Sequence, residues 1–348
     1  MKLEHEFYKL PLSFDSEQLQ HEISQFDESD WTAHHESFEG NSAIALISVN
    51  GTFNNEFKGV MSQTPALKKC TYIQQVIASF GEVISRSRLM RLAPGCEVPL
   101  HNDINYHWHK RVRIHIPITT NDLVVFHCAN QQVNMKKGDC WIFDSWKYHK
   151  VVNNSDEMRV HLVIDTIGSS RFWEMVRERS LVVGHDVDVD VDVEMKINHH
   201  TFNLEQETQI CTENINFPVI MPPSEVKGLT DELTSQIKSY GCNQLEKQTF
   251  IRNIQDFSLD WQENWSKYGD SQEGWRHYHE LRQRVLASIA SLEKLVLVDS
   301  QTSAMNVFIH LIVGPSMNTE LEKMPPYVSN TTSSKSISEV KKTTTTNF

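Results

Sequence analysis

The sequence predicts an α+β protein in which a β-rich domain of the sandwich or barrel type precedes a mainly helical half. Short β-rich runs separated by turn residues follow one another between residues 85 and 166. Helical periodicity returns after about residue 197. A length of 348 residues is enough for two domains. We therefore expect one domain over residues 1–180 and a second, α-rich domain over 197–325.

Composition and charge narrow the class of protein. A hydrophobic fraction of 39% is ordinary for a globular chain, and the net charge of −12 with no Lys/Arg-rich block argues against a nucleic-acid partner. No apolar run is long enough for a signal peptide or a membrane span. The six cysteines are scattered without close pairs, which indicates reduced thiols. These features predict a cytoplasmic protein, not bound to a membrane, that acts on a small or peptide partner.

The first 83 residues are predicted to form helices and strands that precede the barrel. Asp15 or Ser16 can cap a helix whose buried face carries Leu19, Ile23 and Phe26. A strand over 42–49 ends at the turn signal Asn50-Gly51. A second helix is predicted over 66–80. All of these elements are most simply structural.

The stretch that follows supplies the strands of the predicted barrel. They are expected at 88–92, 112–117, 123–127, 140–143 and 159–165. Within the run RVRIHIPI, side chains alternate between the two faces of a strand, so Arg111, Arg113 and His115 share one face. This face predicts an anion inside the barrel. The alternative is a solvated face on an edge strand.

A candidate metal site lies in the same stretch. His101 and Asp103 are two residues apart, and His149 follows on a later segment. Two imidazoles and one carboxylate on one face of an octahedron are the Fe(II) ligands of non-haem oxygenases, where they leave positions open for cosubstrate and dioxygen. A lone histidine is more often a surface or hydrogen-bonded core residue. The Pro-Gly turn before His101 and the Gly-Asp turn before His149 favour the metal site.

The second half carries less chemical information. Alternating Asp and Val between residues 186 and 193 lack the glycine and the closing glutamate of an EF-hand loop, so residues 181–196 are predicted to be an acidic linker or edge strand. Helices are expected at 224–240 and 273–293. The aromatic residues Trp261, Trp265 and Trp275 either cover a substrate cleft or belong to the core. Residues 326–348, rich in Ser, Thr and Lys, are predicted to be disordered.

Several motifs in order resemble one known family. They are Pro94-Gly95, His101-x-Asp103, RVRIHIPI, HCAN at 127–130, KKGDCWIFDSWKYH and RVHLVID. Together they are similar to the aspartyl/asparaginyl β-hydroxylases, a family of 2-oxoglutarate-dependent oxygenases, over about residues 10–175. The resemblance implies a double-stranded β-helix, that is, a cupin-like jelly roll, with its core at about 85–166 and the site in its mouth.

The resemblance also assigns roles to individual residues. It implies that His101 and His149 are the metal histidines and that Arg159 pairs with the distal carboxylate of 2-oxoglutarate. Arg113 and His115 match the residues that hold the other end of the cosubstrate, and Arg111 would face an acidic group of the substrate.

Two departures from the family pattern are visible. Asp103 stands where some members have glycine, which completes the triad and favours hydroxylation over halogenation. Met90 stands where some members have a serine beside the distal carboxylate, and Arg91 and Ser87 are candidates to replace it.

The function implied by the resemblance is a hydroxylation that uses Fe(II), 2-oxoglutarate and O2 and releases succinate and CO2. The substrate would be an amino acid, free, peptide-borne or bound to a carrier protein, modified at Cβ of an Asp- or Asn-like residue. The alternatives are a cupin-like binding module without chemistry and an oxygenase that desaturates or cyclises its substrate. The helical half could cap the barrel mouth, form a dimer interface or bind a carrier.

Overall fold

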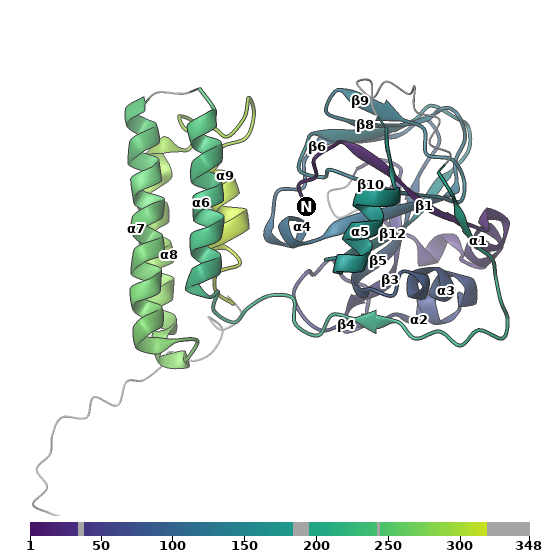
Figure 1. Ribbon diagram of the computed structural model, residues 1–348, viewed down its shortest axis with the longest axis horizontal. Helices are drawn as coiled ribbons and strands as arrows, with labels where there is room; N and C mark the ends of the chain where they lie inside the picture. Colours follow the sequence, from purple (N-terminus) through teal and green to yellow (C-terminus); the bar gives the residue numbers. More distant parts are fainter. Residues whose placement is uncertain (34–37, 184–194, 242–243, 319–348) are drawn as a thin grey trace, which may run out of the picture.

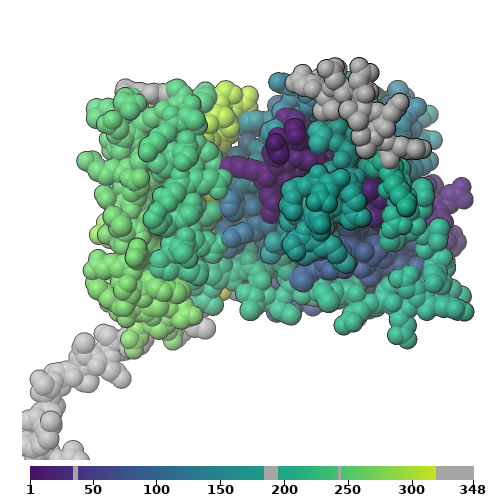
Figure 2. Space-filling view, in the orientation of Figure 1, coloured from purple at the N-terminus to yellow at the C-terminus, as the bar shows by residue number. Residues whose placement is uncertain are grey.

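The computed structural model describes residues 1–33, 38–183, 195–241 and 244–318. A β-barrel domain and a bundle of helices lie side by side (Figure 1), and their surfaces are in contact (Figure 2). Cys70, Cys96, Cys128, Cys140 and Cys211 are free thiols, as predicted. Most of the acidic segment, the cysteine at position 242 and the predicted disordered tail lie outside the described residues.

The barrel domain is built from two sheets that are largely antiparallel. The larger sheet has the order β13 (Leu181–Val183), β1 (Phe7–Phe14), β10 (Asp139–Phe143), β7 (Val112–Thr119), β12 (Arg159–Thr166), β5 (Val83–Leu92), β3 (Asn41–Val49) and β2 (Thr32–Ala33). Three short strands extend it: β14 (Asn198–His200) beside β1, β15 (Cys211–Thr212) beside β5, and β4 (Met61–Gln63) beside β3. The smaller sheet has the order β6 (Glu97–His101), β11 (His149–Asn153), β8 (Val124–Cys128) and β9 (Gln131–Val133).

Strand alternation divides the larger sheet into two chemically different faces. On β7, Ile114 and Ile116 are fully buried in a core that also contains residues of the flanking helices. Arg113 and His115 occupy the opposite face and line a cavity. A second apolar cluster, which includes Phe126 of the smaller sheet, fills the rest of the space between the sheets. The chain therefore forms the predicted jelly roll, and because β7 lies between β10 and β12 the solvated-edge interpretation is wrong.

Helices cover the outer face of the larger sheet. They are α1 (Ser16–Ile23), α2 (Pro65–Lys68), α3 (Thr71–Ser79) and α5 (Ser170–Arg179), with the 3-10 turn η1 (Glu28–Asp30) nearby. The Asp15 side chain accepts hydrogen bonds from the first backbone N–H groups of α1, which confirms the predicted cap. The helix predicted over 66–80 is instead two helices, because the chain leaves helical geometry at Cys70. Strand β1, which the sequence analysis missed, pairs with β10.

The second half contains a bundle of helices, as predicted, but the bundle begins at Pro223 and not at residue 197, because β14 and β15 belong to the larger sheet. Its elements are α6 (Pro223–Ser239), α7 (Gln244–Tyr268), η2 (Gln272–Gly274), α8 (Trp275–Ile289), η3 (Ala290–Leu292), α9 (Ala304–Phe308) and the π-helical turn η4 (Ile309–Val313). Trp261 is fully buried in the bundle core and its Nε1 donates to the Met221 carbonyl (2.8 Å), so it belongs to the core and not to a cleft. Among the described helices, none combines the length and hydropathy needed to cross a lipid bilayer.

Two short elements join the halves. Helix α4 (Tyr106–Lys110) connects β6 to β7 on the side of the barrel that faces the bundle (Figure 1). The Tyr106 hydroxyl donates to Glu225 of α6 (2.8 Å), and Tyr106 and Trp146 pack in the apolar cluster of the bundle. The bundle is therefore docked beside the loops that carry the predicted metal ligands.

Candidate active site

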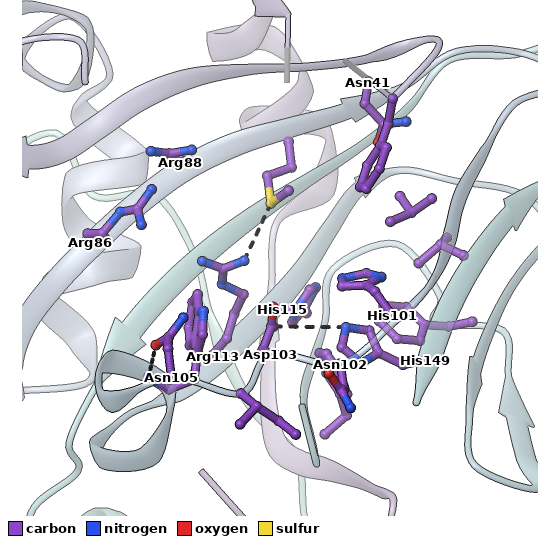
Figure 3. A pocket seen from close by; sticks show the side chains of 18 of the residues that line it. Asn41, Arg86, Arg88, His101, Asn102, Asp103, Asn105, Arg113, His115 and His149 are labelled. Carbon is purple, nitrogen blue, oxygen red and sulfur yellow. Dashed lines mark hydrogen bonds and ion pairs between the residues drawn. The ribbon is translucent and has the colours of Figure 1, made fainter. Parts of the chain in front are cut away.

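A cavity of about 460 Å³ opens between the two sheets at the side that faces the helical bundle. Its lining includes six of the residues that the sequence analysis singled out: His101, Asp103, Arg113, His115, His149 and Arg159. Most of these are visible in Figure 3. The lining does not include Arg91 or Arg111.

Strand pairing brings the predicted metal ligands together. His101 at the end of β6 is the register partner of His149 at the start of β11, and their ring centroids are 4.2 Å apart. The Asp103 Oδ2 lies 3.9 Å from His149 Nε2. One ligand atom from each of the three residues lies within 4.8 Å of the others, a spacing that fits a shared cation. The Asp103 N–H donates to the Ser145 carbonyl (2.8 Å), which fixes the loop that presents the carboxylate.

Hydrogen bonds to the backbone orient both imidazoles toward the same point. His101 Nδ1 lies 2.7 Å from the Pro99 carbonyl, and His149 Nδ1 lies 2.9 Å from the Lys147 carbonyl. Since a carbonyl only accepts, each Nδ1 carries the proton and each Nε2 keeps its lone pair for a metal. Burial lowers the pKa of His149 to about 4, so this imidazole is neutral at neutral pH. The donor set fits Fe(II).

Arg159 is a buried cation without a carboxylate partner among the described residues. Its side chain is 4% exposed, its Nη2 lies 2.8 Å from His161 Nδ1, and its Nε has no hydrogen-bond partner. Burial alone lowers the pKa of Arg159 to about 9. An unpaired buried guanidinium is costly, and a ligand carboxylate would supply the missing charge and acceptor atoms.

Arg113, in contrast, is already paired. Its Nε and Nη2 bond both carboxylate oxygens of Asp165 on β12 (2.8 and 3.1 Å), and its guanidinium stacks on Trp108 at 4.2 Å. The remaining Nη1 lies 3.8 Å from the Met90 sulfur. The pKa of Asp165 is held well below its usual range by Arg113, with a further contribution from His107. Met90, the residue at the family's serine position, thus contacts the arginine predicted to hold the other end of the cosubstrate.

His115 lies deeper between the sheets. Both of its ring nitrogens are buried without a hydrogen-bond partner in the described part of the chain. Burial and the nearby Arg113 and Arg159 hold the pKa of His115 well below its usual range. A neutral imidazole at this point can donate one hydrogen bond to a ligand oxygen, which agrees with the role that the resemblance implies.

Two further arginines, for which the sequence motifs predicted no role, reach the cavity from β5. Arg86 and Arg88 are 4% and 6% exposed and lie at the end of the cavity away from the histidines, with Arg113 in between (Figure 3). Arg86 packs over Phe57 at 4.3 Å, and Arg88 donates to the neutral oxygens of Asn54 and Asn55. Neither has a carboxylate within salt-bridge distance in the described chain. Burial lowers the pKa of both, that of Arg88 to about 10.

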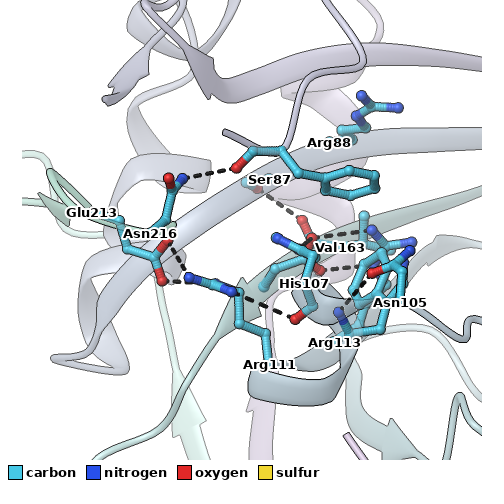
Figure 4. A network of polar contacts seen from close by, with 12 residues as sticks. Ser87, Arg88, Asn105, His107, Arg111, Arg113, Val163, Glu213 and Asn216 are labelled. Atoms are coloured by element: carbon cyan, nitrogen blue, oxygen red, sulfur yellow. Dashed lines mark hydrogen bonds and ion pairs between the residues drawn. The ribbon is translucent and has the colours of Figure 1, made fainter. Parts of the chain in front are cut away.

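The structure places Arg111 and Arg91 away from the cavity. Arg111 is 1% exposed and forms a bidentate ion pair with Glu213 (2.8 and 2.9 Å), a residue about 100 positions later in the chain (Figure 4). It precedes β7, so strand alternation does not govern its direction. Arg91 pairs with Glu28 and stacks on Trp31, outside the lining. Neither guanidinium is available to a ligand in the cavity, so Arg111 does not face a substrate there and Arg91 does not take the place of the family's serine.

An antiparallel jelly roll with a His-Asp-His group in its cavity defines a cupin-like barrel domain with a candidate metal site. A model of the aspartyl/asparaginyl beta-hydroxylase family matches residues 13–168. This match confirms the resemblance seen in the motifs, over a segment that makes up less than half of the chain.

Comparison with solved structures adds more distant likenesses. They include an oxidoreductase of the 2OG-Fe(II) oxygenase family from Burkholderia pseudomallei (11% identity, 44% of this chain and 78% of that chain, TM-score 0.34). Another is a prolyl-4-hydroxylase from Pseudomonas putida (12% identity, 47% of this chain and 92% of that chain, TM-score 0.32). A third is a cupin domain from Bordetella pertussis Tohama I (20% identity, 23% of this chain and 79% of that chain, TM-score 0.20). No curated protein matches the chain.

Proposed function

We propose that this protein is an Fe(II)- and 2-oxoglutarate-dependent hydroxylase of an amino acid with an acidic side chain, modified at Cβ. The observation that carries the proposal is the presence, in one cavity, of the His101, Asp103 and His149 donor atoms and the unpaired Arg159. A metal and a dicarboxylate would satisfy these groups. The family match to residues 13–168 supports the reaction class.

The charges of the cavity favour an acidic substrate over a neutral one. Fe(II), Asp103, 2-oxoglutarate and Arg159 together carry no net charge, and Arg113 is neutralised by Asp165. Arg86 and Arg88 then remain as buried cations with no carboxylate at salt-bridge distance among the described residues. Burying a cation is unfavourable unless an anion accompanies it, so a substrate carboxylate bound at this end is favoured over a carboxamide.

The size of the cavity indicates what part of a substrate it admits. About 460 Å³ is near the lower end of the range for small-molecule pockets, roughly 300–1,000 Å³. Cosubstrate and substrate must share this space. A single amino-acid unit, free or attached to a peptide or carrier, therefore fits better than a folded protein surface.

The chain's own residues have separate tasks in the proposed reaction. When bound, Fe(II) and 2-oxoglutarate supply the oxidation of an unactivated C–H bond by dioxygen, with release of succinate and CO2. Arg159 and the neutral His115 would hold the cosubstrate by charge-assisted and neutral hydrogen bonds. Arg86 and Arg88 would hold the substrate carboxylate and so present its Cβ to the metal side of the cavity. Phe126 and Phe143 limit the access of water between the sheets.

The first experiment tests the metal and cosubstrate. Anaerobic addition of Fe(II) and then 2-oxoglutarate should produce the charge-transfer absorption of a chelated ferrous complex. A folded protein without this absorption would refute the proposal and leave the non-catalytic binding module. Analysis of the products formed under air then distinguishes hydroxylation from desaturation or cyclisation.

The second experiment tests the acidic substrate. Arg86→Gln should reduce kcat/KM for L-aspartyl substrates about 10- to 100-fold, because a hydrogen bond to a charged group is worth roughly 1.5–3 kcal/mol. Succinate release without substrate should not change. Arg284→Gln, an exposed arginine of α8 that pairs with Asp260, is the matched control. Equal turnover of L-aspartyl and L-asparaginyl substrates by the unaltered protein would contradict the assignment.

A further inference from the structure

Three polar side chains, one just before the last helical segment and two on it, lie against the cavity or against the loops that carry the predicted metal ligands. Thr302, Asn306 and His310 recur every four residues, and we call them the polar row. Asn306 and His310 line the cavity together with the predicted metal ligands. Neighbouring side chains such as Val307 and Leu311 are fully buried in the bundle core. The bundle thus turns an apolar face to its own core and a polar face to the barrel's site.

Hydrogen bonds fix the first residue of the polar row, Thr302, beside the predicted ligands. Thr302 is 5% exposed, and its Oγ1 accepts from Asn102 Nδ2 (3.4 Å) and lies 3.1 Å from the Tyr148 hydroxyl. Asn102 stands between His101 and Asp103 in the chain, and Tyr148 directly precedes His149. The start of the row is therefore attached to both segments that carry the candidate metal site.

The geometry of the helix at His310 is unusual. Helix α9 continues without a break into the π-helical turn η4, which contains His310. π-Turns are rare and occur frequently at functional sites, where the wider turn redirects side chains. Asn306 and His310 are both exposed and line the cavity, and neither side chain has a hydrogen-bond partner in the described part of the chain. Both side chains are free to bind a ligand.

The wall of the cavity next to the bundle differs in chemistry from the wall that the larger sheet of the barrel forms. The barrel wall presents the buried cations Arg86 and Arg88, whereas the lining residues Asn102, Ile104, Asn105 and Trp108, which flank Asp103, have uncharged side chains. Asn102 donates to Thr302, and Asn105 accepts from the Trp108 N–H. Asn306 and His310 add two polar side chains that have no hydrogen-bond partner in the described part of the chain. An amide side chain offers a donor and an acceptor, the complement of a peptide group.

We propose that Asn306 and His310 are substrate-positioning residues that bind the amide groups flanking the acidic side chain. The helical bundle is then a wall of the active site, and the substrate is an aspartyl unit in amide linkage and not free aspartate. This inference rests on the function proposed above. It makes the bundle part of the same site. The part of the chain after residue 168, which the family model does not match, then helps to select the substrate.

The test compares free L-aspartate with N-acetyl-L-aspartate N-methylamide on the full chain. The unaltered protein should bind and turn over the amide-flanked compound with a kcat/KM at least tenfold higher. Asn306→Ala and His310→Ala should each reduce this preference roughly three- to tenfold, chiefly through KM, because each removes about one hydrogen bond. Binding of each compound is also measured, from the change that it causes in the charge-transfer absorption of the ferrous 2-oxoglutarate complex. That absorption itself should be the same in all variants.

Matched controls come from the bundle surface away from the cavity. Gln255→Ala on α7 and His277→Ala on α8 remove an amide and an imidazole that are exposed and do not line the cavity, and they should leave the preference unchanged. A normal absorption with no preference for the amide-flanked compound would overturn this inference and leave the proposed function standing. The inference would also be overturned if the double variant Asn306→Ala/His310→Ala kept the full preference for the amide-flanked compound. Loss of the absorption in the unaltered protein would overturn both.

Discussion

Replacing Arg159 with methionine should stabilise the ligand-free protein and abolish its binding of 2-oxoglutarate. The guanidinium is 4% exposed and no carboxylate of the described chain accompanies it. A charge buried in this way destabilises the folded state until a ligand anion binds. Methionine keeps an unbranched side chain of similar length and removes the charge.

The expected gain in stability can be bounded from the structure. Burial lowers the pKa of Arg159 from 12.5 to about 9, so the group remains charged at neutral pH. At about 1.4 kcal/mol for each pKa unit, this corresponds to roughly 5 kcal/mol of unfavourable free energy. The substitution also removes the hydrogen bond to His161, which costs about 1–3 kcal/mol. The free energy of unfolding should therefore rise by about 2–4 kcal/mol.

Chemical denaturation of the metal-free protein, followed by tryptophan fluorescence, measures this change. Titration of the anaerobic Fe(II) protein with 2-oxoglutarate measures the second effect, and affinity should fall at least about 100-fold because two charge-assisted hydrogen bonds are lost. Arg91→Met is the matched control, since Arg91 already has Glu28 as its partner outside the cavity. It should bring no gain in stability and no loss of affinity.

Two results would refute this reasoning about Arg159. If Arg159→Met destabilised the ligand-free protein, the buried guanidinium would have a favourable role in the fold itself. If the variant bound 2-oxoglutarate as tightly as the unaltered protein, the distal carboxylate would lie elsewhere in the cavity.

Two further predictions concern buried groups around the site. Burial lowers the pKa of His107 to about 3, so the unfolded chain binds a proton at His107 more tightly than the folded chain does. The free energy of unfolding of the metal-free protein should therefore fall as the pH decreases from about 6.5 toward 3. His107→Gln should make this decrease smaller, as measured by chemical denaturation at each pH. If the free energy of unfolding of His107→Gln fell just as much between pH 6.5 and 3, His107 would not be the cause of the acid sensitivity. Glu213→Gln leaves Arg111 buried without its partner and should lower the free energy of unfolding by about 3–5 kcal/mol, whereas Arg111→Met/Glu213→Leu should recover most of the loss. Loss of turnover in a fully stable Arg111→Met protein would instead restore a substrate role for Arg111.

Local patterns in the sequence were sufficient for much of the barrel. Alternation along β7 correctly placed Arg113 and His115 on the face opposite Ile114 and Ile116, because side-chain direction in a strand depends only on position. The same rule applied to β5 would have found Arg86 and Arg88 on one face. It failed for Arg111, which lies before the strand begins.

Pairings between distant segments could not be read from such patterns. The neutralisation of Arg113 by Asp165 and of Arg111 by Glu213 depends on which strands and loops become neighbours. The absence of a partner for Arg159 in the described chain is equally a property of the assembled barrel. Sequence separation contains no information about these distances, since chain folding decides which charges meet.

By itself, the sequence determined the class of fold, the resemblance to a family of hydroxylases and the residue types of the candidate metal site. The motifs around His101 and His149 and the periodicity of strands and helices contain this information locally. Only the tertiary structure decided which cations remain unpaired and that the bundle reaches the cavity with Asn306 and His310. The physical reason is that strand register and the docking of the bundle arise from contacts between segments far apart in the chain, and these contacts determine both charge balance and cavity shape.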